Sequence, residues 1–237
     1  MRVMSPAATF SPAPEEFPEG HHLQLVPEGT VAPPDTFYVR HGKRLFDLVA
    51  GFLLLLAFSV PMLLVALVIW STSRGPVLFV QERVGLHLAT FRCFKFRTMV
   101  RDAEVILLQN PQLQDAMAVS WKIPDDPRVT RMGKALRKTS MDELPQLLNV
   151  LTGKMSLVGP RPYMPKELHQ DFGAHAFGIT SVRPGMTGLW QTSGRSHLAP
   201  ADRIALDEQY IAGLSFGSDL MMLLKTVRVV CGRNGAY

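Results

Sequence analysis

The stretch Gly51–Trp70, GFLLLLAFSVPMLLVALVIW, decides the fold of this chain. It lies within a longer run, Leu48–Ser73, that holds no charged residue and is apolar on every side of a helix. As one straight helix this run would be about 39 Å long, which is enough to cross a hydrocarbon core of about 30 Å. Buried helices of soluble proteins rarely run beyond about 20 residues. The pattern therefore predicts a membrane segment.

A proline near the middle of this run predicts a break. Pro61 removes one backbone hydrogen bond and clashes with the preceding turn, while Ser59 can satisfy a freed carbonyl. Each half would then be about 18–20 Å long and would enter one leaflet and return. We expect a re-entrant helix-break-helix over residues 41–74. A kinked helix that spans the bilayer is the alternative.

Positive charge flanks this segment on both sides. The basic residues are Arg40, Lys43 and Arg44 before it, and Arg74, Arg83, Arg92, Lys95, Arg97 and Arg101 after it. Cytoplasmic flanks are enriched in Lys and Arg, so this distribution does not favour sending either end outward. Both ends are therefore expected on the cytoplasmic side, as in a re-entrant hairpin.

The rest of the chain divides into a tail and a domain. Residues 1–40 hold seven prolines and no apolar run, which predicts a flexible tail and argues against a secretory signal. Residues 75–237 carry alternating and helical patterns typical of a globular domain. We expect a mixed α/β domain that is mostly helical.

Local patterns within the domain predict short elements. Strands are expected within 75–85 and 91–99, and loops at 123–127, 153–165 and 183–188. Helices are expected at 101–117 with an interruption near Pro111, and at 134–138, 141–151, 204–212 and 220–230.

Composition narrows the class of partner. The chain has 25 Lys and Arg against 20 Asp and Glu, a formal net charge of +5. A basic surface suits nucleic acid, anionic lipid or a phosphorylated substrate. Basic residues are not interleaved with aromatic ones, and a membrane segment is present, so nucleic acid is not expected. Two distant cysteines exclude a disulfide framework, and no P-loop, GxGxxG or GxSxG motif occurs.

The run LRKTSMDELPQLLNVL is the densest in chemical groups. Ser140 and Glu143 have the spacing of a capping box, and Asp142 would lie in the first helical turn, where the helix dipole favours it. A phosphate could approach the same turn, with Arg137 and Lys138 close by in sequence. Aspartate can also act as a nucleophile on phosphorus. The structural and the catalytic interpretation are compatible.

Two further motifs carry cations suited to phosphate. Lys95 lies in FKFRTM, two residues before Arg97 and on the same face of the expected strand. Arg161 lies in the loop GPRP, whose prolines restrict the backbone. From these patterns alone, Lys95 and Arg97 could equally be a solvated basic face of the strand. Arg161 could equally be a surface arginine in a turn. The loop RPGMTGLWQTSGR is not specific by itself.

These segments, in this order, resemble the bacterial sugar transferases, the small monotopic phosphoglycosyl transferases. The matching stretches are KRLFDLVAG, GPVLFVQERVG, FKFRTM, DDPRVTRMGKALRKTSMDELPQLLNVLTGKMSLVGPRP, RPGMTGLWQTSGR and LLKTVRVVCGRNGAY. The resemblance covers residues 41–237 and is closest to the short members that initiate exopolysaccharide assembly. Two departures are Val60, which separates Ser59 from Pro61, and Phe216, near which the family often has tryptophans.

The resemblance implies a reaction and a site. The family moves a hexose 1-phosphate from a UDP-sugar to undecaprenyl phosphate and releases UMP. By similarity Asp142 attacks the β-phosphate and forms a covalent phosphosugar, and Glu143 assists. Both acids would hold Mg²⁺, and Lys95, Arg137 and Arg161 would bind phosphates. The resemblance also implies the bacterial inner membrane, with the catalytic domain on the cytoplasmic side and helices at the membrane interface.

Several alternatives stay open. The chain could be an inactive membrane scaffold of a polysaccharide assembly complex, although the intact acid pair and the three cations argue against a loss of activity. A CDP-alcohol phosphotransferase is disfavoured, because its paired DGxxAR-type acids are absent. UDP-glucose and UDP-galactose are both candidate donors. A homo-oligomer is also left open.

Overall fold

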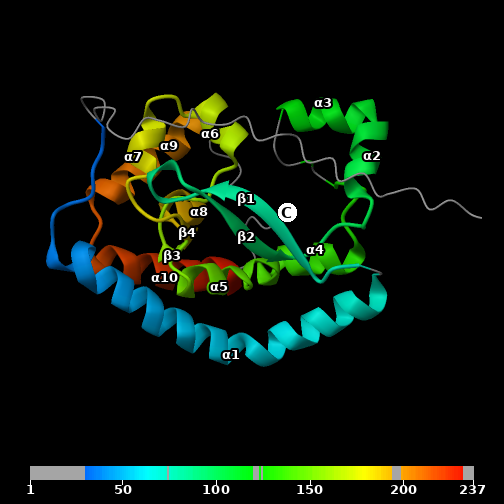
Figure 1. Cartoon of the computed structure of the whole chain (residues 1–237), viewed down its shortest axis with the longest axis horizontal. Coiled ribbons are helices and arrows are strands. Elements are labelled where there is room, and N and C mark those ends of the chain that lie inside the picture. Colours follow the sequence, from blue (N-terminus) through cyan, green and yellow to red (C-terminus); the bar gives the residue numbers. More distant parts are fainter. Residues whose placement is uncertain (1–29, 74, 120–122, 124, 194–198, 232–237) are drawn as a thin grey trace, which may run out of the picture.

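The computed structural model describes residues 30–73, 75–119, 123, 125–193 and 199–231. The predicted tail, residues 1–40, therefore lies mostly outside the described residues. A long helix runs along one side of a mostly helical body that contains two short sheets (Figure 1). This arrangement confirms the expected mixed α/β class.

The apolar run forms a single long helix. A π-helical turn, η1 (Tyr38–Gly42), leads into α1 (Lys43–Thr72), which continues through Pro61. Figure 1 shows α1 bowed, with its middle farthest from the domain. Ser59 Oγ donates to the carbonyl of Leu56 at 2.7 Å. The helix is thus bent but unbroken, and the two antiparallel halves of a tight hairpin are not seen.

The exposure of its side chains shows whether α1 resembles a membrane helix or the buried helix of a protein core. The continuous helix Tyr38–Thr72 is long and apolar enough to cross a membrane, and only 11% of its most apolar 18-residue window is buried. Large apolar side chains face outward along its whole length, among them Phe52, Leu56, Val60, Leu64 and Trp70. Such a continuous apolar surface is characteristic of contact with lipid. The chain is therefore expected to associate with a membrane.

Buried polar contacts hold the N-terminal end of α1. Lys43 Nζ lies 2.6 Å from Asp219 Oδ2, and the Asp219 carboxylate is fully buried. Asp47 Oδ1 accepts hydrogen bonds from Ser156 Oγ at 3.0 Å and from the Leu157 N–H at 2.9 Å. Buried carboxylates are tolerated only when they are paired in this way. This end of the helix is therefore fixed to the domain.

The C-terminal end of α1 is held by the same domain. Arg97 Nη2 donates to the carbonyl oxygen and to Oγ of Ser73, at 3.0 and 2.5 Å. Ile69 is buried in a small apolar cluster with Phe96 and Leu136. One domain thus binds both ends of α1, while the bowed middle is exposed.

The first sheet pairs the two predicted strands as a hairpin. Strand β1 (Leu78–Val84) pairs antiparallel with β2 (Thr90–Phe96), and Phe79 lies opposite Lys95 in the register. A short 3₁₀ turn, η2 (Leu86–Leu88), joins them. Strand β2 ends at Phe96 rather than at Met99, which forms an isolated bridge to Val129.

The second sheet lies where only loops were expected. Strand β3 (Ser156–Val158) pairs in parallel with β4 (Gly185–Thr187). Each strand has three residues and is flanked by Gly or Pro, so the alternation that marks a strand is too short to see. The expectation of loops at 153–165 and 183–188 was therefore wrong at these positions.

The helices follow the sequence patterns where these are long. They are α2 (Ala103–Gln109), α3 (Pro111–Val119), α4 (Arg131–Lys138), α5 (Gln146–Leu151), α6 (Pro165–Asp171), α7 (His175–Ile179), α8 (Leu189–Ser193), α9 (Pro200–Ala212) and α10 (Phe216–Cys231). The interruption at Pro111 is confirmed. The expected helix 141–151 is split into a 3₁₀ turn, η3 (Met141–Glu143), and α5. Helices α6, α7 and α8 were not predicted, because five to seven residues show no clear helical period.

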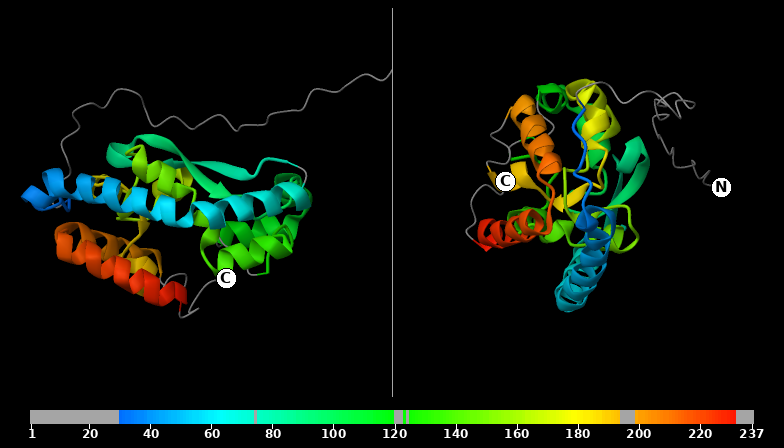
Figure 2. Two further views of the ribbon diagram at one scale, coloured as in Figure 1. Left: turned by 90° about the horizontal axis from the view of Figure 1, so that it is seen from below. Right: turned by 90° about the vertical axis from the view of Figure 1, so that its left-hand side faces the viewer.

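Helix α10 shares an exposed apolar face with α1. The rings of Tyr38 and Phe46 contact the ring of Phe216, where the two helices lie next to each other. Both helices run along the same side of the domain (Figure 2). Leu224 and Val227 of α10 are 64% and 62% exposed, so the apolar surface of α1 extends onto α10.

Replacing Lys43 with methionine tests the tether at the N-terminal end of α1. The change leaves the buried carboxylate of Asp219 without its cation, so we expect the free energy of unfolding to fall by about 3–5 kcal/mol. Arg40→Met removes one partner of the exposed Arg40–Asp35 pair and should cost less than about 1 kcal/mol. Thermal or denaturant unfolding in detergent measures both. Equal losses of unfolding free energy in the two variants would contradict a stabilising role of the Lys43–Asp219 pair.

Candidate active site

A left-handed residue places the acid pair. Ser140 has φ 55° and ψ 17°, and its side chain makes no capping hydrogen bond among the described residues. The expected capping box is therefore wrong, because an N-cap residue needs an extended backbone for its hydroxyl to reach the helix. A non-glycine residue in this region is uncommon and strained, and such residues concentrate at functional sites. The turn separates α4 from η3, which carries Asp142 and Glu143.

Strand β2 supplies a cation to this turn. Lys95 Nζ lies 2.7 Å from Glu143 Oε1, and both side chains are partly exposed. The lysine and the acid pair come from segments 48 residues apart in sequence. The structure therefore brings together two of the motifs singled out in the sequence.

Asp142 differs from Glu143 in its surroundings. Burial, together with the neighbouring Glu143, raises the pKa of Asp142 to about 6. Lys95 and Arg137 oppose this rise, so both cations lie within electrostatic range of the Asp142 carboxylate. A poorly solvated carboxylate that is still ionised at neutral pH is suited to act as a nucleophile.

Helix α4 positions Arg137. Thr130 Oγ1 caps this helix by accepting from the Gly133 N–H at 2.9 Å. Gly133 allows a close approach, since a Cβ there would lie 2.0 Å from the carbonyl oxygen of Thr98. Arg137 Nε, one helical turn farther on, donates to Thr98 Oγ1 at 3.0 Å. The guanidinium is thus held beside the end of β2.

Backbone hydrogen bonds fix the loop that carries Arg161. The Gly185 N–H donates to the carbonyl of Pro160 at 2.7 Å, and the Val84 N–H donates to the carbonyl of Tyr163 at 2.9 Å. Arg161 itself lies over the ring of Trp190, 5.8 Å from its centroid. Arg161 is therefore placed by this loop and by Trp190, and no contact with Asp142 is seen in the described structure.

Arg83 connects the two groups of residues and was not singled out from the sequence. It is buried at the end of β1, and its Nη1 donates to the carbonyl of Pro162 at 3.0 Å. Burial and the neighbouring Arg161 lower its pKa to about 10, while Glu167 and Glu143 oppose this. Arg83 thus lies within electrostatic range of both Glu143 and Arg161. A charged residue at an inward position of a predicted strand is the signal that could have identified it.

The buried carboxyl of Asp207 lies within electrostatic range of Arg161. Tyr163 donates through its hydroxyl to Asp207 Oδ2 at 2.8 Å. Burial raises the pKa of Asp207 to about 7, while Tyr163 and Arg161 oppose this rise. Arg203 of α9 also lies over the ring of Trp190, 5.2 Å from its centroid. Two arginines therefore share this aromatic ring.

The acid pair fits the magnesium ion that the family resemblance implies. No group of three or more His, Cys, Asp or Glu side chains that could hold a metal is found among the described residues. Magnesium ions that act on phosphates are commonly held by only one or two carboxylates, and the substrate supplies the other oxygens. Asp142 and Glu143 provide such a pair, with cations beside them for the remaining phosphate charge.

The fold and the site together indicate a class of protein. A helix suited to a membrane carries a domain in which an acid pair lies among lysine and arginine side chains. This is the arrangement expected of a membrane-bound transferase of phosphorylated groups.

Comparisons with known proteins agree with this class. The model of the bacterial sugar transferase family matches residues 38–233. The chain is 42% identical over 199 residues to the exopolysaccharide production protein ExoY of Rhizobium meliloti (strain 1021), a match that covers 82% of this chain and 88% of that protein. The chain therefore belongs to the bacterial sugar transferase family, as the sequence motifs predicted.

Longer relatives carry more specific names. The chain is 39% identical over 199 residues to the undecaprenyl-phosphate galactose phosphotransferase of Salmonella typhimurium, covering 82% of this chain and 41% of that protein. It is 42% identical over 204 residues to the undecaprenyl-phosphate glucose phosphotransferase of Komagataeibacter xylinus, a match that covers 81% of this chain and 36% of that protein. The chain is thus an enzyme, a phosphoglycosyl transferase.

Asp207 should make stability depend on pH. Its folded-state pKa of about 7 lies above the unfolded value near 4, so the native state binds more protons between these values. The free energy of unfolding should therefore fall as pH rises from about 4 to 7. Asp207→Asn keeps an oxygen acceptor for Tyr163 and removes the titration. It should match the wild type at pH 4 and exceed it at pH 8 by on the order of 4 kcal/mol.

Unfolding measured at pH 4 and pH 8 checks this expectation. Asp171→Asn, a change at an exposed position of α6, is the control and should behave like the wild type at both pH values. A pH-independent difference between Asp207→Asn and the wild type would contradict the burial of an ionisable carboxyl at this position.

Proposed function

We propose that this enzyme transfers hexose 1-phosphate from a UDP-hexose to undecaprenyl phosphate and releases UMP, as the first step of exopolysaccharide assembly. The names of relatives support a polyprenyl phosphate acceptor and either galactose or glucose as the sugar. The name of a third relative supports the place in exopolysaccharide production. The observation that carries the proposal is the position of Asp142, an ionised, partly desolvated carboxylate within range of Lys95 and Arg137.

The reaction would proceed in two displacements at phosphorus. A carboxylate oxygen of Asp142 attacks the β-phosphorus of the UDP-hexose, and the bond from that phosphorus to the bridging oxygen breaks. The bridging oxygen leaves with UMP, and the hexose phosphate remains bound to Asp142 as an acyl phosphate. A phosphate oxygen of undecaprenyl phosphate then attacks the same phosphorus. This second step forms the lipid diphosphate sugar and frees the Asp142 carboxylate.

The neighbouring residues have separate tasks. Glu143 is held by its ion pair with Lys95, and Asp142 is the acid of the pair that would attack. Arg137 is held by Thr98 and can direct its remaining N–H groups at phosphate oxygens. Lys95 and Arg161 would bind further phosphate oxygens, and Glu143 would assist as an acid–base or metal-binding residue.

The donor set supports a role for Mg²⁺ at the acid pair. Asp142 and Glu143 would hold the ion, which when bound neutralises part of the diphosphate charge. The lysine and arginine side chains would then compensate the charge that is left on the phosphates.

The two tethers of α1 support a re-entrant placement in the inner membrane. Lys43 and Asp47 fix one end of the helix to the domain, and Arg97 fixes the other end through Ser73. A polar domain that binds both ends requires both ends to lie on the same side of the bilayer. The bowed apolar middle would enter the cytoplasmic leaflet, with α10 at the interface and the catalytic domain in the cytoplasm.

Asp142→Asn tests the catalytic role. The amide cannot form the acyl phosphate, so we expect UMP release to fall at least ~1000-fold while the protein remains folded. The assay supplies undecaprenyl phosphate, Mg²⁺ and either UDP-glucose or UDP-galactose to the full chain in lipid particles. Asp171→Asn is the control for loss of one carboxylate and should keep full activity. UMP release by Asp142→Asn at the wild-type rate would contradict the role of Asp142 as the nucleophile. A wild-type protein that is inactive with every UDP-hexose would favour the alternative of an inactive membrane scaffold.

Single cysteines test the placement of α1. Phe37 is 80% exposed before the helix, and Thr72 is exposed at its end. In a chain whose native cysteines are replaced, Phe37→Cys and Thr72→Cys should both resist a membrane-impermeant maleimide in spheroplasts. Both should react once the membrane is permeabilised. Labelling of one site but not the other in intact spheroplasts would show a spanning helix.

A further inference from the structure

We propose that a cavity at the C-terminal end of α1 binds the phosphate group of a membrane lipid. The cavity has a volume of about 280 Å³. Its lining includes Ile69 and Thr72 of α1, Arg97 after β2, and Thr130, Arg131 and Met132 at the start of α4. None of the described residues that line it is acidic. It lies at the opposite end of α4 from Arg137, and is thus separate from the acid pair.

Arg97 gives this cavity a fixed positive charge. Its Nη2 is occupied by two hydrogen bonds to Ser73, which hold the guanidinium in place. Its Nη1 is buried against Gly75, and no described residue accepts a hydrogen bond from it. A buried donor without an acceptor is unfavourable, and a phosphate oxygen is a strong acceptor for a guanidinium N–H. The arginine is therefore positioned but incompletely satisfied.

Arg131 adds a second positive charge. Its side chain is exposed and lines the same cavity as Arg97. The first turn of α4 contributes as well, because the N–H groups at a helix start carry partial positive charge. Thr130 caps this turn through Gly133. Two arginines and a helix start converging on one cavity favour a ligand with two or more anionic oxygens.

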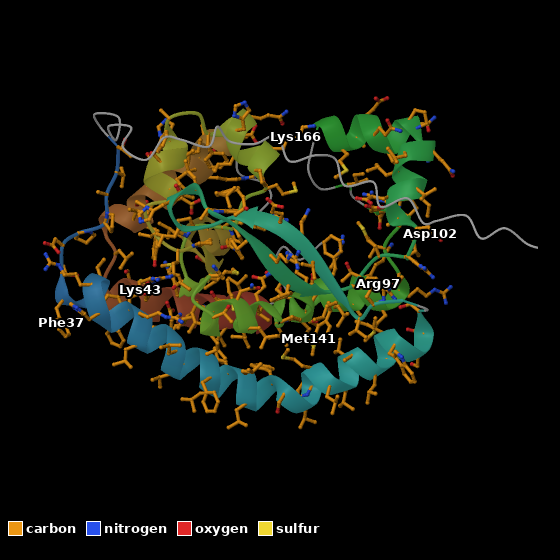
Figure 3. The ribbon with its side chains drawn as sticks, viewed as in Figure 1. Phe37, Lys43, Arg97, Asp102, Met141 and Lys166 are labelled. Carbon is orange, nitrogen blue, oxygen red and sulfur yellow. The ribbon has the colours of Figure 1, made fainter. Side chains whose placement is uncertain are left out.

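The apolar part of the lining points to a lipid rather than a free ion. Ile69 and Met132 line the same cavity as the two arginines. Trp70, the next residue of α1 after Ile69, is 70% exposed, and tryptophan is enriched where a protein crosses from hydrocarbon to headgroups. In Figure 3, Arg97 lies just above the C-terminal half of α1, whereas Lys166 lies on the far side of the domain. A lipid phosphate could enter the cavity while its chains follow α1.

Lipid binding by the full chain tests this inference, which rests on the proposed membrane placement but not on the role of Asp142. Native mass spectrometry of the Asp142→Asn protein in non-ionic detergent gives apparent dissociation constants without turnover. The probes are undecaprenyl phosphate, phosphatidylglycerol, and diacylglycerol, which lacks a phosphate. Arg131→Gln should weaken binding of at least one phosphate-bearing lipid about tenfold and leave diacylglycerol unchanged. A loss for undecaprenyl phosphate alone identifies the acceptor as the ligand, and a loss for both lipids identifies a general lipid phosphate site.

Matched variants keep the test decisive. Lys166→Gln removes one positive charge from an exposed position far from the cavity and should bind all three lipids like the parent. Arg97→Lys keeps the charge but loses the fork geometry, and should also weaken phosphate-lipid binding. Equal affinities for Arg131→Gln and Lys166→Gln would overturn the inference, as would tight binding of diacylglycerol. Failure of the covalent mechanism would appear instead in UMP release and would leave these affinities unaffected.

Discussion

The attachment of both ends of one apolar helix to one polar domain is the constraint on which the rest of the structure depends. One face of α1 packs on the domain and the other is an exposed apolar surface along the whole helix, while its ends are fixed by Lys43, Asp47 and, through Ser73, Arg97. Two of these three contacts involve buried carboxylates, whose partners cannot be removed without a large loss of stability. The domain is therefore fixed in orientation relative to the apolar face that α1 and α10 share.

This orientation explains where the acid pair lies. Helix α5, which follows η3 directly, packs against α1, so Asp142 and Glu143 are held close to the membrane helix. A water-soluble sugar nucleotide and a lipid acceptor can both reach a site at such a boundary. The left-handed Ser140 and the close approach of Gly133 to Thr98 bring α4, η3 and β2 together there. The fold thus places Asp142, the proposed nucleophile, close to the apolar helix α1.

The sequence predicted the features that depend on long patterns or on chemistry, and missed those that depend on tertiary contacts. The apolar helix, the strands β1 and β2 and the interruption at Pro111 follow from periodicity and proline. The parallel pairing of β3 with β4 could not be predicted, because it joins three-residue strands that are distant in the chain. Lys95, Glu143 and Asp142 were found by residue type. The buried Arg83 and the backbone of Ser140 were missed, because their roles arise only from packing and turn geometry.

The covalent phosphosugar is the central claim, and intact-protein mass spectrometry tests it most directly. The wild-type chain is incubated with Mg²⁺ and a UDP-hexose in the absence of undecaprenyl phosphate, then quenched and weighed. The account predicts a mass increase of one hexose phosphate, located on the peptide that contains Asp142 and lost when undecaprenyl phosphate is added. UMP release that requires the lipid acceptor and leaves no adduct on the protein would contradict it.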